Sequence, residues 1–71
     1  MPKQIKIYSR TVIDFGTLSR YEYKGSLYLD RDIEKLNDTS KQQIAETFDC
    51  LYDVLFVDDR NTIVPFRMEG C

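Results

Sequence analysis

Apolar side chains occupy mainly odd positions along the first 29 residues, with polar side chains between them. These odd apolar positions are Ile5, Ile7, Ile13, Phe15, Tyr21, Tyr23, Leu27 and Leu29. A period of two is typical of a strand with one buried face, because successive side chains of a strand point to opposite sides. The pattern therefore predicts one strand from Lys3 towards Phe15 and a second, either continuous or divided in two, from Leu18 to Leu29.

The segment between these strands contains Gly16, which takes a positive φ at no steric cost and so suits a turn. Because both strands bury odd residues, odd positions must face one another, and a five-residue loop over Asp14–Leu18 satisfies this condition. The resulting pairs are Ile5 with Leu27, Ile7 with Gly25, Ser9 with Tyr23 and Thr11 with Tyr21. In three of these pairs a small residue faces a large one. The alternative is a tight turn at Lys24–Gly25, which makes residues 26–29 a third strand.

After these strands the pattern indicates helical structure. Asp30 is suited to cap a short helical turn that Asn37 ends. Thr39 or Ser40 is placed to cap a second helix, with a glutamine three residues later in the spacing of a capping box. One apolar stripe follows at i, i+4, i+7 and i+11, formed by Ile44, Phe48, Leu51 and Leu55. The stripe predicts an amphipathic helix from about Ser40 to about Val54.

The C-terminal part of the chain returns to an alternating pattern. An extra short strand fits around Phe56, before the polar cluster Asp58–Asn61, which is typical of a loop. Residues 62–68 alternate again, and Pro65 places this strand at a sheet edge because proline lacks the amide for a ladder hydrogen bond.

Together these elements predict one α+β domain over residues 1–71. We expect a three- to four-stranded, mainly antiparallel sheet with one amphipathic helix packed on one face. The predicted core consists of Ile5, Ile7, Ile13, Tyr23, Leu27, Leu29, Ile44, Phe48, Leu51, Leu55, Val64 and Phe66.

Composition narrows the function classes. The 71 residues include two cysteines, Cys50 and Cys71, and no histidine. We expect both thiols to be reduced. No run reaches the roughly 18 apolar residues of a membrane helix, and the first residues lack the apolar core of a signal peptide, so we expect a cytoplasmic protein. The net charge of −2 conceals an asymmetry, since residues 1–29 carry +3 and residues 30–71 carry −5.

Acidic residues give the first candidate site. On the predicted helix Glu46, Asp49 and Asp53 lie at i, i+3 and i+7, opposite the apolar stripe, and Asp58 and Asp59 follow in the loop. A solvated helix face explains such a stripe. The functional interpretation is an acidic surface that binds a basic groove of a protein partner, since complementary potentials direct association.

The polar face of the first two strands gives a second candidate. Lys6, Tyr8 and Arg10 share the even face of the first strand, and Arg20 and Lys24 have even positions on the second. Basic residues beside an aromatic side chain on a sheet bind single-stranded nucleic acid in some proteins. The alternative is an ordinary solvent face, with Tyr21 and Tyr23 on the apolar side.

Metal and catalytic sites are not expected. Three acids alternate as at the start of a calcium loop, at Asp30, Asp32 and Glu34. However, Lys35 holds the position that needs glycine and Lys41 the position that needs glutamate, so the sequence argues against calcium. With neither histidine nor a cluster of cysteines, a classical zinc site is excluded. Without histidine, the thiol of Cys50 also has no activating base. No cofactor is expected.

The run Arg20–Gly25, followed by Leu27, Leu29, Asp32 and Glu34, resembles a stretch of the small uracil-DNA glycosylase inhibitors of Bacillus phages. Those proteins are compact, acidic and α+β, and they block a DNA-binding enzyme. The resemblance covers about a fifth of the chain and consists of residue types common at any junction of strand and helix. It assigns no family and implies no site residues.

These observations favour a small acidic protein-binding module, of the inhibitor or regulator type that phages and mobile elements encode. Its partner would be a protein, for example a nucleic-acid-binding enzyme, and the acidic residues would be the contact. A nucleic-acid-binding protein that uses the basic face is the first alternative, with an affinity that falls steeply with salt. A homodimeric structural subunit that pairs through an exposed sheet edge is the second. An enzyme is not expected.

Overall fold

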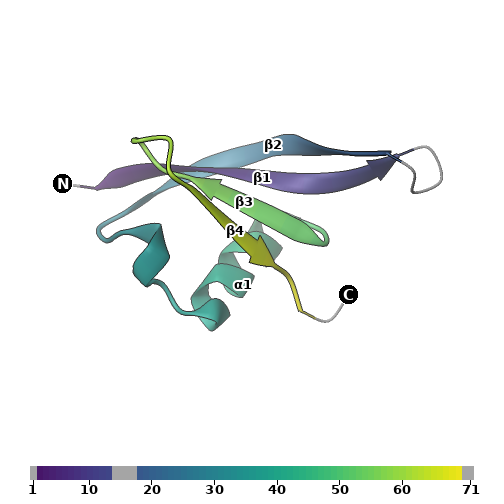
Figure 1. Cartoon of the computed structure of the whole chain (residues 1–71). Coiled ribbons are helices and arrows are strands. Elements are labelled where there is room, and N and C mark those ends of the chain that lie inside the picture. The colour runs from purple at the N-terminus through teal and green to yellow at the C-terminus, as the bar shows by residue number, and fades with distance from the viewer. Residues whose placement is uncertain (1, 14–17, 70–71) are drawn as a thin grey trace.

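The computed structural model describes residues 2–13 and 18–69. Its elements in chain order are β1 (Lys3–Ile13), β2 (Leu18–Leu29), the 3-10 helix η2 (Ile33–Lys35), α1 (Asp38–Thr47), β3 (Asp53–Val57) and β4 (Ile63–Arg67). The strands form one sheet in the order β2-β1-β3-β4, with every neighbouring pair antiparallel. Both helical segments cover the same side of the sheet (Figure 1). The predicted α+β class, with one helix on one face of an antiparallel sheet, is confirmed.

The β1–β2 hairpin is longer than the rest of the sheet. β2 is one continuous strand of 12 residues, so the alternative of a turn at Lys24–Gly25 is wrong. β3 pairs only with residues 6–9 of β1, and the far end of the hairpin extends past it as a two-stranded ribbon (Figure 1). The predicted loop falls mostly on residues 14–17, which lie outside the described residues, but Leu18 itself belongs to β2 and pairs with Ile13.

A β-bulge changes the register in the middle of this hairpin. The predicted pairs Ile5 with Leu27 and Ile7 with Gly25 are confirmed. The predicted pairs of Ser9 and Thr11 are wrong, because the register shifts between Ile7 and Tyr8. The partners observed beyond this shift are Tyr8 with Tyr23, Ser9 with Glu22, Arg10 with Tyr21 and Thr11 with Arg20. Lys24 is the extra residue of the bulge, and from this point even positions of β2 face odd positions of β1.

Gly25 allows this bulge. Its φ of 143° lies in a region that residues with a Cβ rarely adopt. A Cβ at this position would also lie only 2.8 Å from Cε1 of Phe48, so the aromatic ring occupies the space that a side chain would need. Two features therefore favour glycine at position 25. One is the backbone conformation of β2, and the other is the packing of Phe48, which follows α1.

The helix is shorter than the sequence pattern predicts. Its cap is Asn37, whose side chain accepts a hydrogen bond from the amide of Ser40 at 2.8 Å, and its last residue is Thr47. Asp49 and Tyr52 have positive φ angles of 56° and 62°, which ends any helix there. The stripe predicted through Leu51 and Leu55 therefore does not form.

The core lies between the sheet and the two helical segments. Its buried members are Ile5, Ile7, Ile33, Ala45, Cys50, Val54 and Phe56. Six further predicted core residues pack against it, namely Leu27, Leu29, Ile44, Phe48, Val64 and Phe66. Four predicted core residues are wrong: Ile13, Tyr23 and Leu51 are exposed, and Leu55 lies on the other side of the sheet. The strand predicted around Phe56 is confirmed as β3, which contributes Val54 and Phe56.

The β3–β4 hairpin forms the edge of the sheet opposite β2. The carboxylate of Asp58 accepts hydrogen bonds from the amides of Arg60 and Thr62 at 2.9 and 2.8 Å, which fixes the turn between β3 and β4. β4 is an edge strand and contains Pro65, as predicted. Among the described residues, no helix is both long and apolar enough to cross a bilayer.

Candidate binding face of the sheet

One side of the sheet carries no helix, and we call it the outer face. Its side chains alternate with the core-facing side chains of each strand. They include Tyr21, Tyr23, Ser26 and Tyr28 on β2, Gln4, Lys6, Tyr8, Arg10 and Val12 on β1, Asp53, Leu55 and Val57 on β3, and Ile63, Pro65 and Arg67 on β4. The strand registers arrange most of them in rows that cross all four strands.

The central row of the outer face is entirely apolar or aromatic. Tyr8 pairs with Tyr23 on one side and with Leu55 on the other, and Leu55 pairs with Pro65. The rings of Tyr8 and Tyr23 have centroids 5.5 Å apart and are inclined at 58°, within the range of favourable aromatic pairs. Tyr23 is 55% exposed, although an aromatic side chain of this size is usually buried at least in part against a neighbour. The row forms an apolar strip that nothing in the described chain covers.

A second row carries charge. Arg10 pairs with Tyr21 along the ladder, and its Nη1 donates to Oδ2 of Asp53 at 2.7 Å. Asp53 in turn pairs with Arg67 along the ladder. Among the described residues, Arg67 forms no ion pair within 4.0 Å, whereas Arg10 has its partner. The row therefore ends, at the edge of the sheet, in a guanidinium group that no carboxylate of the described chain neutralises.

Between these two rows the surface is hollowed. The depression has a volume of about 300 Å³, near the lower limit of small-ligand pockets. Its lining residues come from β2, β3 and β4, and they are Tyr21, Asp53, Val54, Leu55, Pro65, Phe66 and Arg67. It thus combines aromatic and apolar groups with two opposite charges in one site.

The third row lies on the other side of the apolar strip. Lys6 pairs with Ser26 and with Val57, and Val57 pairs with Ile63. Ile63 is 57% exposed. Across its rows the outer face carries three basic side chains and one acidic side chain, a net charge of +2, although the whole chain has a net charge of −2.

The five acidic residues predicted as a partner contact lie in different elements, not on one helix face with a following loop. Glu46 is on α1, but Asp49 follows the end of the helix, and Asp53 lies on the outer face with Arg10. Asp58 uses its carboxylate within the turn after β3, and Asp59 is exposed in that turn. The physical reason is the early end of α1, which places three of these residues in different elements.

The predicted basic face forms in part. Lys6, Tyr8 and Arg10 lie together on the outer face, as the alternation of β1 predicts. Arg20 does not join them, because the bulge turns it to the opposite side, where its guanidinium pairs with Glu22 at 3.0 Å. Lys24 lies in the bulge itself, and its charge acts on the thiol of Cys50 on the helix side.

The same bulge brings residues to the outer face that the sequence pattern assigned to the core side. Tyr21 and Tyr23 are the clearest cases, and they stand beside Tyr8 and Arg10 instead of beneath the helix. One signal in the sequence points to this change. An isolated glycine within a strand pattern, here Gly25, is typical of a β-bulge.

Cys50 is a free cysteine in the core. It is 3% exposed, and burial raises the pKa of its thiol. Weaker effects come from a hydrogen bond with Ser9 and from the charge of Lys24, which lower the pKa, and from Asp49, which raises it. Burial thus disfavours the thiolate form of Cys50. Among the described residues, histidine, cysteine and acidic side chains nowhere gather in groups of three that would suit a metal ion.

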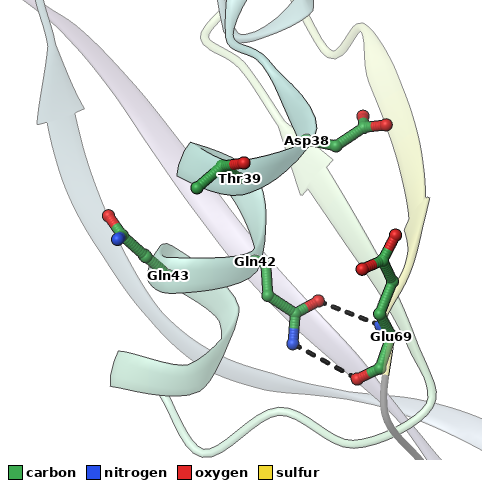
Figure 2. Close-up of a pocket in the computed structure, with 5 residues that line it drawn as sticks. All are labelled: Asp38, Thr39, Gln42, Gln43 and Glu69. Atoms are coloured by element: carbon green, nitrogen blue, oxygen red, sulfur yellow. Dashed lines mark hydrogen bonds between the residues drawn. The ribbon is translucent and has the colours of Figure 1, made fainter.

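A second hollow lies at the start of α1, with a volume of about 210 Å³ (Figure 2). It is lined by Asp38, Thr39, Gln42, Gln43 and Glu69. The amide of Gln42 accepts from the backbone N–H of Glu69 at 3.0 Å and donates to its carbonyl oxygen at 3.4 Å. This double contact attaches the segment after β4 to the helix, so the hollow is a by-product of a structural link.

Comparisons with protein families, with curated proteins and with solved structures give no match. The geometry of the outer face is therefore the basis for assigning a function.

Proposed function

We propose that this chain is a small protein-binding module that holds its partner on the outer face and acts stoichiometrically, as an inhibitor or regulator does. The observation that supports this most directly is the uncovered row of Tyr23, Tyr8, Leu55 and Pro65. Interfaces between proteins are enriched in tyrosine and arginine around an apolar centre. The outer face has this composition, with arginines beside the strip.

The contact in this proposal differs from the acidic surface that the sequence suggested. The acidic residues are dispersed over several elements, whereas the rows of the outer face are contiguous. A partner that covers the strip would also cover Tyr21 and Ile63, which are 44% and 57% exposed.

The test is capture of partners from a cell lysate with wild-type protein and two double variants. Tyr8→Ser with Tyr23→Ser removes the aromatic half of the strip, and we expect it to abolish capture, because each truncated anchor at an interface costs about 2 kcal/mol or more. Glu46→Lys with Asp49→Lys is the matched control, and we expect it to retain the partner. Nuclease treatment should leave capture unchanged.

Two results would contradict the proposal. Loss of the partner with Glu46→Lys and Asp49→Lys, but not with the tyrosine variant, would return the contact to the acidic residues. Equal capture by all three proteins would show that the partner contacts neither the tyrosine strip nor the acidic residues. Circular dichroism of each variant establishes that the fold is intact.

A second candidate function is binding of single-stranded nucleic acid. The specific observation in its favour is the pair of Tyr8 and Tyr23 between Lys6 and Arg10. Bases stack on such aromatic pairs. The β3 and β4 part of the face is largely aliphatic, however, through Leu55, Val57, Ile63 and Pro65. The net charge of the chain is negative, which opposes binding of a polyanion. Capture that disappears with nuclease would favour this function.

A further inference from the structure

The outer face differs in net charge from the rest of the chain, and this difference bears on the chemistry of the partner. The outer face carries +2 while the whole chain carries −2, so the remaining side chains carry −4. Complementary potentials guide association and exclude wrong partners. A protein that binds the outer face should therefore present carboxylates around an apolar centre.

A second copy of this chain does not meet that condition. Two outer faces packed against each other would bring +2 against +2, and like charges opposed across an interface are unfavourable. Asp53 offers the only acidic group among the described residues of this face, and it is already paired with Arg10. A second copy packed outer face to outer face is therefore disfavoured, and we take a different protein as the occupant.

The depression beside Arg67 is a place on the outer face where an apolar group and a carboxylate of a partner could bind together. Tyr21, Leu55 and Pro65 form apolar walls. The carboxylate of Asp53, which also lines the hollow, is paired with Arg10, whereas the guanidinium of Arg67 has no ion-pair partner among the described residues. An apolar side chain would fill the hollow, and a carboxylate next to it in sequence would reach Arg67. A guanidinium presents a planar fork of donors that matches a carboxylate.

We propose that the depression on the outer face is an anchor site for a partner-protein segment in which an apolar or aromatic residue stands next to an aspartate or glutamate. This inference rests on the proposed function, because it assigns the partner chemistry of the same face. Arg67 is the residue that determines the acidic preference, and Tyr21 is the residue that determines the apolar one.

The experiment is a selection of binders from a displayed library of random linear peptides, with the full chain as bait. We expect the selected peptides to share an apolar or aromatic residue adjacent to Asp or Glu. A representative peptide should bind Arg67→Gln about tenfold more weakly than wild type, which corresponds to loss of one charge pair at an interface. Lys35→Glu, which changes charge on η2 at the covered side, should bind it as wild type does.

Reversal of the charge provides the sharper readout. A selection against Arg67→Glu should replace the acidic residue of the consensus by Lys or Arg and keep the apolar residue. Peptides that are lost with Tyr8→Ser and Tyr23→Ser but show no acidic preference would overturn this inference and leave the proposed function standing. Peptides indifferent to every outer-face substitution would overturn both.

Two parallel measurements test whether a nucleic acid or a second copy of this chain occupies the outer face instead. Titration with an oligothymidylate that binds wild type, but not the tyrosine variant, would show that the anion is a nucleic acid and overturn the inference. A concentration-dependent dimer in sedimentation equilibrium, abolished by the same variant, would show that a second copy covers the face and would overturn it equally.

Discussion

At the scale of single residues, Ser9 shows how one hydroxyl connects two parts of the fold. It is 1% exposed, and it is the buried polar residue among the described core positions. Its Oγ donates to the carbonyl of Leu51 at 3.2 Å and accepts from the amide of the same residue at 2.9 Å. Both backbone groups of Leu51 are thereby satisfied at the point where the chain leaves the helix layer and enters β3.

Replacement of Ser9 by alanine should lower the free energy of unfolding by about 1–3 kcal/mol, because it leaves the part-buried backbone donor and acceptor of Leu51 without their protein partner. Ser26→Ala is the matched control, since Ser26 accepts a bond from Gln4 at 3.3 Å on the outer face. We expect the control to cost about 0.5 kcal/mol or less. Urea denaturation of the three proteins measures both values, and equal costs would show that the Leu51 bonds contribute nothing specific.

The sequence pattern predicts that Ser9 lies on the buried face, but it does not predict the role of its hydroxyl. Alternation along β1 places it between Ile7 and Thr11 on the core side, and the structure confirms its burial. The expected reason was a large partner, Tyr23, across the hairpin. The actual partner is Glu22, and the small side chain is required by the backbone of Leu51, 42 residues away. Periodicity identifies a face, but a contact at that separation requires the tertiary fold.

At the scale of elements, the bulge in β2 determines which tyrosines reach the outer face. The alternating pattern predicts both β1 and β2, and it predicts that β2 ends at Leu29. It also predicts the pairing of Ile5 with Leu27. A one-residue shift at Lys24 then reversed the faces of everything beyond it. The glycine that marks this position was visible in the sequence, whereas the aromatic ring of Phe48 that occupies its missing side chain was not.

Gly25→Ala should destabilise the fold by about 2 kcal/mol or more, through backbone strain and through the 2.8 Å approach of its Cβ to Phe48. The two causes separate in a double-mutant cycle. In a Phe48→Leu background the ring is absent, and we expect the glycine substitution to cost about 1 kcal/mol less. Strictly additive free energies would assign the whole effect to the backbone and contradict the packing argument.

The boundary between α1 and β3 shows why the predicted helix was too long. Residues 51 and 55 continue the helical spacing of Ile44 and Phe48, but Val54 and Phe56 alternate with Leu55 in the spacing of a strand. Both periods fit the same short apolar run, and periodicity alone does not decide between them. Pairing with β1 favours the strand, because it buries Val54 and Phe56 fully. The acidic site inferred from the longer helix was lost with it.

At the scale of the whole molecule, one ion pair connects the start of β1 to the segment that holds η2. Lys3 donates to the carboxylate of Asp32, the residue that precedes η2. The hydrogen bond from Lys3 and then its charge hold the pKa of Asp32 below the ordinary aspartate value, and the more distant charges of Lys35 and Arg60 act in the same direction. The contact connects β1 to the segment that begins η2, next to Ile33, which is 1% exposed.

This lowered pKa predicts the sign of an acid effect on stability. A carboxyl group whose pKa is depressed in the folded state contributes stability above its unfolded pKa and loses it as the pH falls through the folded value. Lys3→Met should therefore destabilise the protein at neutral pH, and the difference from wild type should shrink as the pH is lowered through the aspartate range.

Urea midpoints of both proteins, measured from neutral pH to about pH 2, give this difference. Lys35→Met is the matched control, because its Nζ lies 3.8 Å from Asp32 and its side chain is 75% exposed, so its charge is screened by solvent. We expect the control to follow the wild-type curve closely. A difference between wild type and Lys3→Met that is constant with pH would mean that Lys3 stabilises the layer through the packing of its methylene chain, and the end of the core would then be closed by apolar contact instead of by charge.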